Sequence, residues 1–182
     1  MVKAIKVMLI PNNVQKTKLF QYAGASRFAY NWALAREIEN YEKGGKFISD
    51  AELRKEFTKL RHSDEYAWLL SISNNVTKQA IKDACTAYKN FFKGLQKFPR
   101  FKSKKRSMPK FYQDNVKIQF SNTHVKLEGF SSSRKANKQK KNWVRLAEHG
   151  RIPTDVKYMN PRISFDLSLI HISEPTRHSL IS

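Results

Sequence analysis

The chain has 182 residues, with 35 Lys plus Arg against 15 Asp plus Glu and a formal net charge of +20. Hydrophobic residues make up 40% of it, which excludes a wholly disordered chain. A single cysteine, Cys85, excludes a disulfide framework and a cysteine-based zinc site, and no apolar run is long enough to span a membrane. The positive charge favours a polyanionic partner, most often nucleic acid, and we expect a cytoplasmic protein.

The first half of the chain predicts one strand followed by helices. Residues 3–10 alternate partly in hydrophobicity and end at a proline, which predicts a strand. A long helix ended by Gly44 and Gly45 follows. Its apolar stripe consists of Leu19, Ala23, Tyr30, Leu34, Ile38 and Tyr41.

Two further helices are expected before residue 98. Ser49 and Glu52 have the spacing of a capping box and start a helix with Leu53, Phe57 and Leu60 on one side. After a short helical piece, DEYAWLL, a last helix begins at Ser73 and extends to about Lys97. Cys85 lies on this helix, where we expect a packed small apolar residue.

The character of the chain changes after residue 97. Residues 98–110, FPRFKSKKRSMPK, contain two prolines among many cations and predict a loop. Short strands are then expected at 116–120, 124–130, 143–147, 155–159 and 162–166. A polar basic run from Arg134 to Lys141 separates two of them, and it is either a nucleic-acid contact or a solvated loop.

The order of strand, helices and strands predicts an α+β protein. We expect an incomplete β-barrel with a helical bundle inserted after its first strand. The expected parts are a first strand at 1–11, a helical bundle at 12–97, a basic loop with the remaining strands at 98–166, and a separate tail at 167–182.

Catalytic and metal-binding patterns are weak in this sequence. Most acids, Glu37 among them, lie on polar helix faces and are interpreted as solvated surface. Asp166, in ISFDLSLI, resembles the strand aspartate that opens ribonuclease-H-like nuclease sites, but the usual Gly just beyond it is absent, and Glu174 in the tail is the only acid after it. The five histidines do not have metal-binding spacing. We therefore assign no catalytic and no metal-binding residue.

The basic segment KNFFKGLQKFPRFKSKKRSMPKFYQ is the strongest candidate for a nucleic-acid interface. Its cations can neutralise phosphates, and its aromatic rings can stack on unpaired bases. We expect most of these rings, including Phe91, Phe92, Phe98 and Phe101, to be core residues beneath a basic rim. The candidate phosphate-binding residues are Arg100, Lys102, Lys104, Lys105, Arg106 and Lys110.

Four motifs in series resemble the N-terminal half of TnpB, the insertion-sequence OrfB family of transposase-associated proteins related to miniature type V CRISPR effectors. They are VMLIPNNVQKTKLF, SRFAYNWAL, TAYKNFFKG and FPRFKSKK, and the resemblance covers about residues 3–166. It implies a wedge-type barrel with an inserted helical recognition bundle, and a protein that binds a guide RNA from the transposon end and double-stranded DNA. No small-molecule substrate and no membrane are implied.

By the same resemblance, the helix that begins at Ser73 faces the target-adjacent duplex. Asn74, Asn75 and Lys78 occupy the positions expected to contact it, and Gln113 is a similarly placed candidate. The alternative for both asparagines is helix capping. The RuvC carboxylates with their Mg²⁺, and a structural Zn²⁺, are expected only in the half of the family that this sequence lacks. The chain as it stands is thus expected to bind nucleic acid without cutting it.

Two other classes of protein remain in competition. A non-enzymatic basic binding module, such as a helix-turn-helix regulator, would more often be one compact trihelical unit. A transposase of another chemistry would need an acidic triad that we do not find. The tail at 167–182 begins LSLIHISEPTR, which resembles a translated sequencing-library adapter, so we exclude it from the expected fold.

Overall fold

The computed structural model describes residues 4–129, 142–154, 156–165 and 179–181. It shows an α+β protein with two compact units. One unit contains residues 1–23 and 108–182, and the other contains residues 24–107. The boundaries differ from those expected at 11 and 97, because the first turns of the long helix pack on the sheet and the basic loop packs with the helices.

The first unit is built on one antiparallel sheet with the strand order β2-β6-β7-β1-β5-β4-β3. Its described strands are β1 (Val7–Ile10), β2 (Lys110–Tyr112), β3 (Gln119–Phe120), β4 (His124–Lys126), β5 (Trp143–Leu146), β6 (Arg162–Phe165) and β7 (Ser179–Ile181). The order ends at β2 and at β3, so the described sheet is open and does not close into a barrel. The wedge-barrel expectation is therefore supported only as far as an α+β fold with an antiparallel sheet.

The start of helix α1 (Asn13–Glu42) covers the core of this sheet. The Phe20 ring stacks on Phe165 of β6 with centroids 4.4 Å apart, and Tyr22 meets Phe111 of β2 edge-on at 5.5 Å. Gln15 donates from its side-chain amide to the Trp143 carbonyl of β5. Alternating strand residues supply the rest of the core, as the period of two requires. These are Val7, Leu9, Val125, Val144, Leu146 and Ile163.

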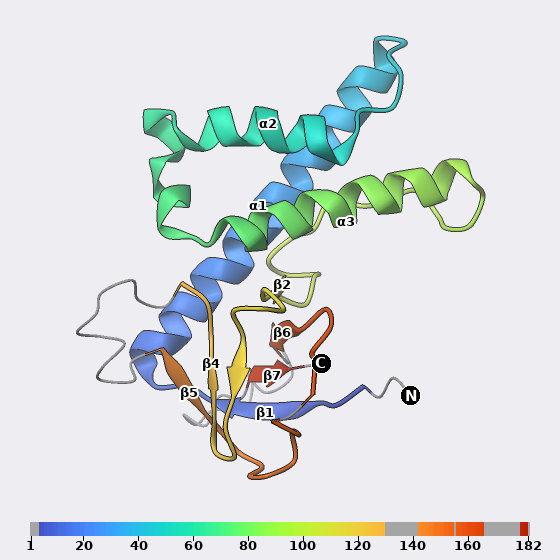
Figure 1. Cartoon of the computed structure of the whole chain (residues 1–182). Coiled ribbons are helices and arrows are strands. Elements are labelled where there is room, and N and C mark those ends of the chain that lie inside the picture. Colours follow the sequence, from blue (N-terminus) through green and yellow to red (C-terminus); the bar gives the residue numbers. More distant parts are fainter. Residues whose placement is uncertain (1–3, 130–141, 155, 166–178, 182) are drawn as a thin grey trace. The chain divides into compact units, whose positions relative to one another are not determined.

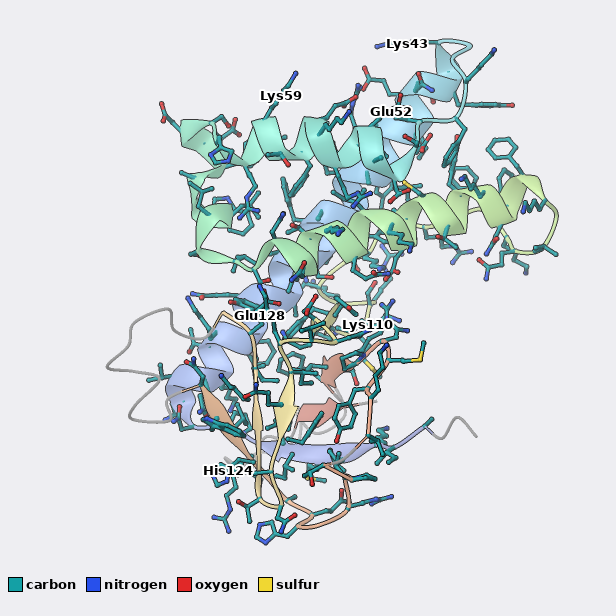
Figure 2. The ribbon with its side chains drawn as sticks, viewed as in Figure 1. Lys43, Glu52, Lys59, Lys110, His124 and Glu128 are labelled. Atoms are coloured by element: carbon teal, nitrogen blue, oxygen red, sulfur yellow. The ribbon has the colours of Figure 1, made fainter. Side chains whose placement is uncertain are left out.

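The second unit consists of the remaining turns of α1, helix α2 (Asp50–Arg61), the 3₁₀ helix η1 (Asp64–Ser71) and helix α3 (Asn74–Phe92). Figure 1 shows α2 and α3 lying across α1. The capping box is confirmed, because Ser49 accepts from the Glu52 amide and Glu52 accepts from the Ser49 amide. Lys43 and Lys59 extend into solvent from the ends of α1 and α2 (Figure 2).

The helices follow the sequence expectations more closely than the strands do. The last helix ends at Phe92 rather than near Lys97, because Gly94 adopts a φ of 70° and turns the chain. Only the last two residues of the strand expected at 116–120 form β3, and residues 156–159 form no strand. In contrast, β2 begins at the last residue of the loop expected at 98–110 and continues into residues for which no strand was expected.

Three residues of the tail form a strand. In this structure β7 pairs with β1 and β6, whereas the sequence analysis excluded residues 167–182 from the fold. When two strands have unpaired edges that face each other, a short extended segment can bind between them through main-chain hydrogen bonds. Such bonds do not depend on side chains, so the pairing of β7 requires no particular sequence in the tail. The foreign origin of the tail stays a hypothesis about the source DNA. Residues 166–178 and 182 lie outside the described residues.

Among the described residues, no helix is long and apolar enough to cross a membrane.

Candidate nucleic-acid interface

The basic loop after α3 is fixed to α1 at Lys102. The side-chain amide of Asn31 donates to the Lys102 carbonyl, its oxygen accepts from the Lys102 amide, and both distances are 2.8 Å. The Lys102 ammonium lies 3.4 Å from the ring centroid of Tyr30, which is a cation–π contact. Lys102 is therefore half-buried and serves to anchor the loop, in addition to its expected role as a phosphate contact.

Beyond this anchor, residues Ser103–Ser107 form a closed turn, which we name the basic turn. The Ser107 amide donates to the Ser103 carbonyl at 3.0 Å, and the Ser103 amide donates to the Ser107 hydroxyl at 3.1 Å. The Ser103 hydroxyl accepts from the Arg106 amide. The two serines satisfy the backbone, so the turn presents three neighbouring cations to solvent. They are Lys104, Lys105 and Arg106, all exposed.

The charge around the basic turn is one-sided. Residues 84–113 contain no Asp and no Glu, and among the described residues none of the three exposed cations of the turn forms an ion pair. Adjacent like charges repel one another, so a polyanion that screens them is a favourable partner. Arg100 and Lys110 are exposed as well, Lys110 at the start of β2 (Figure 2). The Arg134–Lys141 run lies outside the described residues.

The N-terminal end of α3 is fixed by Arg61. Ser73 is the N-cap, with its hydroxyl accepting from the Asn75 amide, so capping is performed by Ser73 rather than by Asn74 or Asn75. The guanidinium of Arg61 donates to the Asn74 side-chain oxygen at 2.9 Å. Because a guanidinium can only donate, this contact fixes which end of the Asn74 amide points inward.

The contact with Arg61 limits what Asn74 can recognise. Bidentate pairing with adenine needs both the oxygen and the NH₂ group of an asparagine. Since the oxygen of Asn74 is held by Arg61, its NH₂ group is the part oriented to donate, which suits a phosphate or a base acceptor. Lys78, one turn further along, is exposed and adds a cation at this end of α3.

Arg61 itself is a residue that the sequence analysis missed. It is buried at 8% exposure, and its guanidinium also donates to the carbonyls of Leu69 and Ile72. Burial lowers the pKa of its guanidinium. Its place four residues after Phe57 and eight after Leu53, on the apolar side of α2, was a signal that this cation would be buried.

Gln113 does not belong to an exposed interface. It has no exposed surface, its backbone amide donates to the Pro161 carbonyl, and its side-chain oxygen accepts from the Glu128 backbone amide. A residue held inside the sheet unit cannot reach a duplex, so we correct its place among the candidates. The neighbouring Asp114 accepts from the amides that follow it and forms the turn before β3.

Glu37 also departs from the sequence expectation, because it is 1% exposed instead of solvated. Its only described donor is the Ile48 amide at 3.3 Å, and its other carboxyl oxygen is buried without a partner. Burial raises the pKa of Glu37 to about 7, although the Ile48 amide and the Lys89 ammonium act in the opposite direction. Burial, with help from Glu37, raises the pKa of Cys85 to about 12, so Cys85 is an inert packed thiol as expected.

The aromatic side chains of the basic segment are less buried than expected. Phe92, Phe98 and Phe101 are 52%, 45% and 55% exposed, whereas the sequence analysis placed most of these rings in the core. Their spacing among cations and Gly94, without a sustained helical or strand period, was a signal against a core role.

Among the described residues, no group of three or more His, Cys, Asp or Glu side chains is arranged to hold a metal ion. The residues present in this part of the chain therefore do not fit a catalytic metal site. Asp166, the one carboxylate that resembled a nuclease residue, lies outside the described residues.

Comparison with known proteins gives one family and two relatives. Residues 1–46 match a family model of the OrfB/IS605 type, described as a helix-turn-helix domain. The described part of that range contains β1 and the single long helix α1. The chain is 34% identical over 123 residues to "Putative RNA-guided DNA endonuclease InsQ" of Escherichia coli (strain K12), which covers 68% of the chain and 31% of that protein.

A second relative is named "Putative RNA-guided DNA endonuclease" and comes from Streptomyces pristinaespiralis. It is 30% identical over 105 residues, which cover 58% of the chain and 26% of the relative. The chain therefore spans about a third and about a quarter of these two relatives.

Proposed function

The chain belongs to the TnpB/OrfB family, and from this premise we propose that it is the nucleic-acid-binding part of a transposon-associated, RNA-guided DNA endonuclease. Both relatives carry an RNA-guided endonuclease in their names, and the chain matches less than a third of either. In this proposal it binds the guide RNA and the duplex beside the target. The sheet unit is then part of a wedge-type barrel, and the helical unit is the recognition bundle.

The observation that carries the proposal is the basic turn. Three exposed cations, Lys104, Lys105 and Arg106, are presented by a backbone that two serines close, within thirty residues that contain no acid. Binding of these cations to phosphates would release counterions from the nucleic acid, which gives salt-dependent affinity. The NH₂ group of Asn74 and the ammonium of Lys78 at the start of α3 would add contacts to phosphates or base acceptors of a duplex.

Catalysis is proposed to depend on residues outside the described part of the chain. The described residues do not fit a metal site, so the Mg²⁺ of the nuclease reaction and a structural Zn²⁺ are assigned to the remainder of the family's length. The chain alone is then expected to bind nucleic acid and to leave it uncut.

A binding experiment with charge-matched variants tests the proposal. The Lys104→Gln, Lys105→Gln, Arg106→Gln triple variant should bind a structured transposon-end RNA at least about tenfold more weakly at ~0.1 M salt. The slope of log affinity against log salt should become shallower by about 2, since each lost phosphate contact removes about 0.7 for single strands. Fluorescence anisotropy with labelled RNA measures both quantities.

The control variant is Lys46→Gln, Lys55→Gln, Lys59→Gln, which removes the same charge from exposed positions of the same unit. It should change affinity by less than about twofold, because these cations lie on chain segments that also carry acids. Equal losses of RNA affinity in both triple variants would show that the basic turn contributes only through the net charge of the chain and not as a specific binding site. Equal affinity of the unaltered chain for bulk tRNA and transposon-end RNA would favour the alternative, a generic basic binding module.

A further inference from the structure

The C-terminal end of α3 carries a cluster of five aromatic side chains, which we name the ring cluster. Tyr88 meets Phe92 at 5.1 Å and Phe98 at 6.1 Å between ring centroids. Phe91 meets Phe92 at 5.2 Å and Phe98 at 5.1 Å, and Tyr41 of α1 meets Phe92 at 5.3 Å. The rings thus contact one another across the end of α1, the last turns of α3 and the following loop.

The cluster is layered, with buried rings supporting exposed ones. Tyr88 is 3% exposed and belongs to the core, whereas Tyr41, Phe92 and Phe98 are 58%, 52% and 45% exposed. Edge-on contacts with the Tyr88 ring hold Phe92 and Phe98 in place, and Tyr41 packs on Phe92. Such a surface is preorganised, so a flat ligand can bind without first ordering the side chains.

The loop geometry extends this surface toward the basic turn. Gly94 turns the chain with a φ of 70°, and the Leu95 amide donates to the Asn90 carbonyl at 2.9 Å. The chain then passes Phe98 and Phe101 and reaches the Lys102 anchor. Exposed rings and the cations of the basic turn therefore follow one another along a single fixed loop.

The charges around the ring cluster select its partner. Lys93, Lys97 and Arg100 are exposed between the rings, and residues 84–113 contain no acid. Two carboxylates act on the cluster, because burial, then Glu37, Tyr41 and Glu42 raise the pKa of Tyr88. Glu37 is buried, and Glu42 is exposed at the end of α1. A protein partner that covered these rings would also have to desolvate the cations. A nucleic-acid strand offers base faces for the rings and phosphates for the cations.

We propose that the ring cluster binds unpaired nucleotides, with Phe92 and Phe98 stacking on neighbouring bases while Lys93, Lys97 and Arg100 contact the phosphates. The proposal rests on the nucleic-acid-binding function above and specifies the part of the ligand that this surface takes. Paired bases in a duplex cannot present their faces to these rings, so the ring cluster distinguishes single-stranded from double-stranded segments.

The test compares the Phe92→Leu, Phe98→Leu double variant of the full chain with the unaltered chain. Leucine keeps an apolar side chain and removes the aromatic face. Probes are single strands of about 12 nucleotides, as RNA and as DNA, and a duplex of equal length. We expect the double variant to lose about tenfold or more in affinity for the single strands and less than about twofold for the duplex.

Two further variants make the result specific. Trp68→Leu removes another exposed ring of the same unit, one that lies beside Asp64 and Glu65 in sequence, and should leave all affinities unchanged. Phe92→Trp with Phe98→Trp should restore single-strand binding, and its tryptophan fluorescence should be quenched by the bound strand. Binding of RNA alone, or of both RNA and DNA, supports the proposal and identifies which source of unpaired bases the surface accepts.

Other outcomes overturn the inference. Equal losses of affinity for single strands and duplex would show that the rings do not select unpaired bases. Unchanged affinity of the double variant for every probe would show that the rings do not bind nucleic acid and would favour a protein partner for this surface. If the unaltered chain bound neither kind of probe at ~0.1 M salt, the proposed function itself would fail instead.

Discussion

Under the N-terminal end of α3 lies the buried guanidinium of Arg61, whereas the carboxyl of Glu37 is buried beside the C-terminal half of the same helix. Arg61 donates to three oxygens and leaves its Nε without a partner among the described residues, while Glu37 accepts from one amide and leaves an oxygen without a partner. A buried charge is tolerated when several hydrogen bonds compensate its burial, and an acid with a single such bond is instead held near neutrality.

This difference separates two kinds of surface on one helix. At the N-terminal end, the hydrogen bond from Arg61 fixes Asn74 and leaves its NH₂ group and Lys78 suited to donating hydrogen bonds. At the C-terminal end, Tyr88 and its neighbours support exposed rings suited to stacking. The comparison predicts that substitutions at Arg61, Glu37 and Ser73 have effects of different size and different dependence on pH.

The largest effect on stability is expected for Arg61→Met. Loss of the guanidinium leaves the Ile72 carbonyl and the Asn74 side-chain oxygen without the Arg61 donor, and it leaves the Leu69 carbonyl with the Ile72 amide alone. This change should lower the free energy of unfolding by about 3 kcal/mol. Arg54→Met on the same helix is the control, and its half-exposed ion pair with Asp50 should be worth less than about 1 kcal/mol. Urea unfolding measures both free energies. Equal losses of stability in the two variants would show that the buried hydrogen bonds of Arg61 contribute no more than an exposed ion pair.

The Glu37→Gln variant should change how stability depends on pH. The pKa of Glu37 in the folded chain, about 7, lies above its ordinary value, so the folded state binds the extra proton. Its stabilising contribution is present below about pH 4.5 and is lost as the pH rises through about 7. The unfolding free energy of wild type should therefore fall relative to Glu37→Gln by about 3 kcal/mol between pH 4.5 and pH 8.

The two curves should be measured by urea unfolding in the same buffers, because other titrating groups then cancel in the difference. If the difference in unfolding free energy between wild type and Glu37→Gln stayed constant across this range, Glu37 would be solvated. The contrast between a buried cation and a buried neutral acid beneath α3 would then be wrong. The Cys85 thiol does not enter this comparison, since its pKa of about 12 lies above the range.

A smaller effect is expected for Ser73→Ala. Removing the N-cap hydroxyl should lower the free energy of unfolding by about 1 kcal/mol. Ser71→Ala, which removes an exposed hydroxyl bonded to the Trp68 carbonyl, should cost only a few tenths and serves as the control in thermal unfolding. If Ser73→Ala were as mild as its control, Asn74 or Asn75 would be the effective cap, as one reading of the sequence allowed.

The parts of the structure that could be predicted are those fixed by local contacts. The Ser49–Glu52 capping box, the cap at Ser73 and the turn at Gly44 each involve residues within a few positions of one another. The cations of the basic turn could be predicted for a similar reason, because dense like charges are exposed in almost any fold.

The strands depended on partners far along the chain. Strand β2 pairs with β6, about fifty residues later, and nothing within KFY itself indicates this pairing. The strand expected at 116–120 was shortened because Asp114 accepts from the Val116 and Lys117 amides and holds a turn there. Strand length is set by pairing rather than by propensity at such short elements.

The candidate site shows the same division between local and distant causes. Gln113 appeared to be a polar residue before a strand, and its burial follows from bonds to the Pro161 carbonyl and the Glu128 amide. Glu37 has a local signal, since it lies three residues after Leu34 and four before Tyr41 on the apolar stripe of α1. Its burial was nevertheless decided by α3 and by the segment at Ile48.

The central claim is that nucleic acid binds along the segment from the ring cluster to the basic turn. Ultraviolet crosslinking of the full chain to a transposon-end RNA, followed by mass spectrometry of the crosslinked peptides, tests this claim most directly. We predict crosslinks to aromatic residues within 88–101, and their loss in the Phe92→Leu, Phe98→Leu variant. Crosslinks confined to the sheet unit, with none in this segment, would contradict the account.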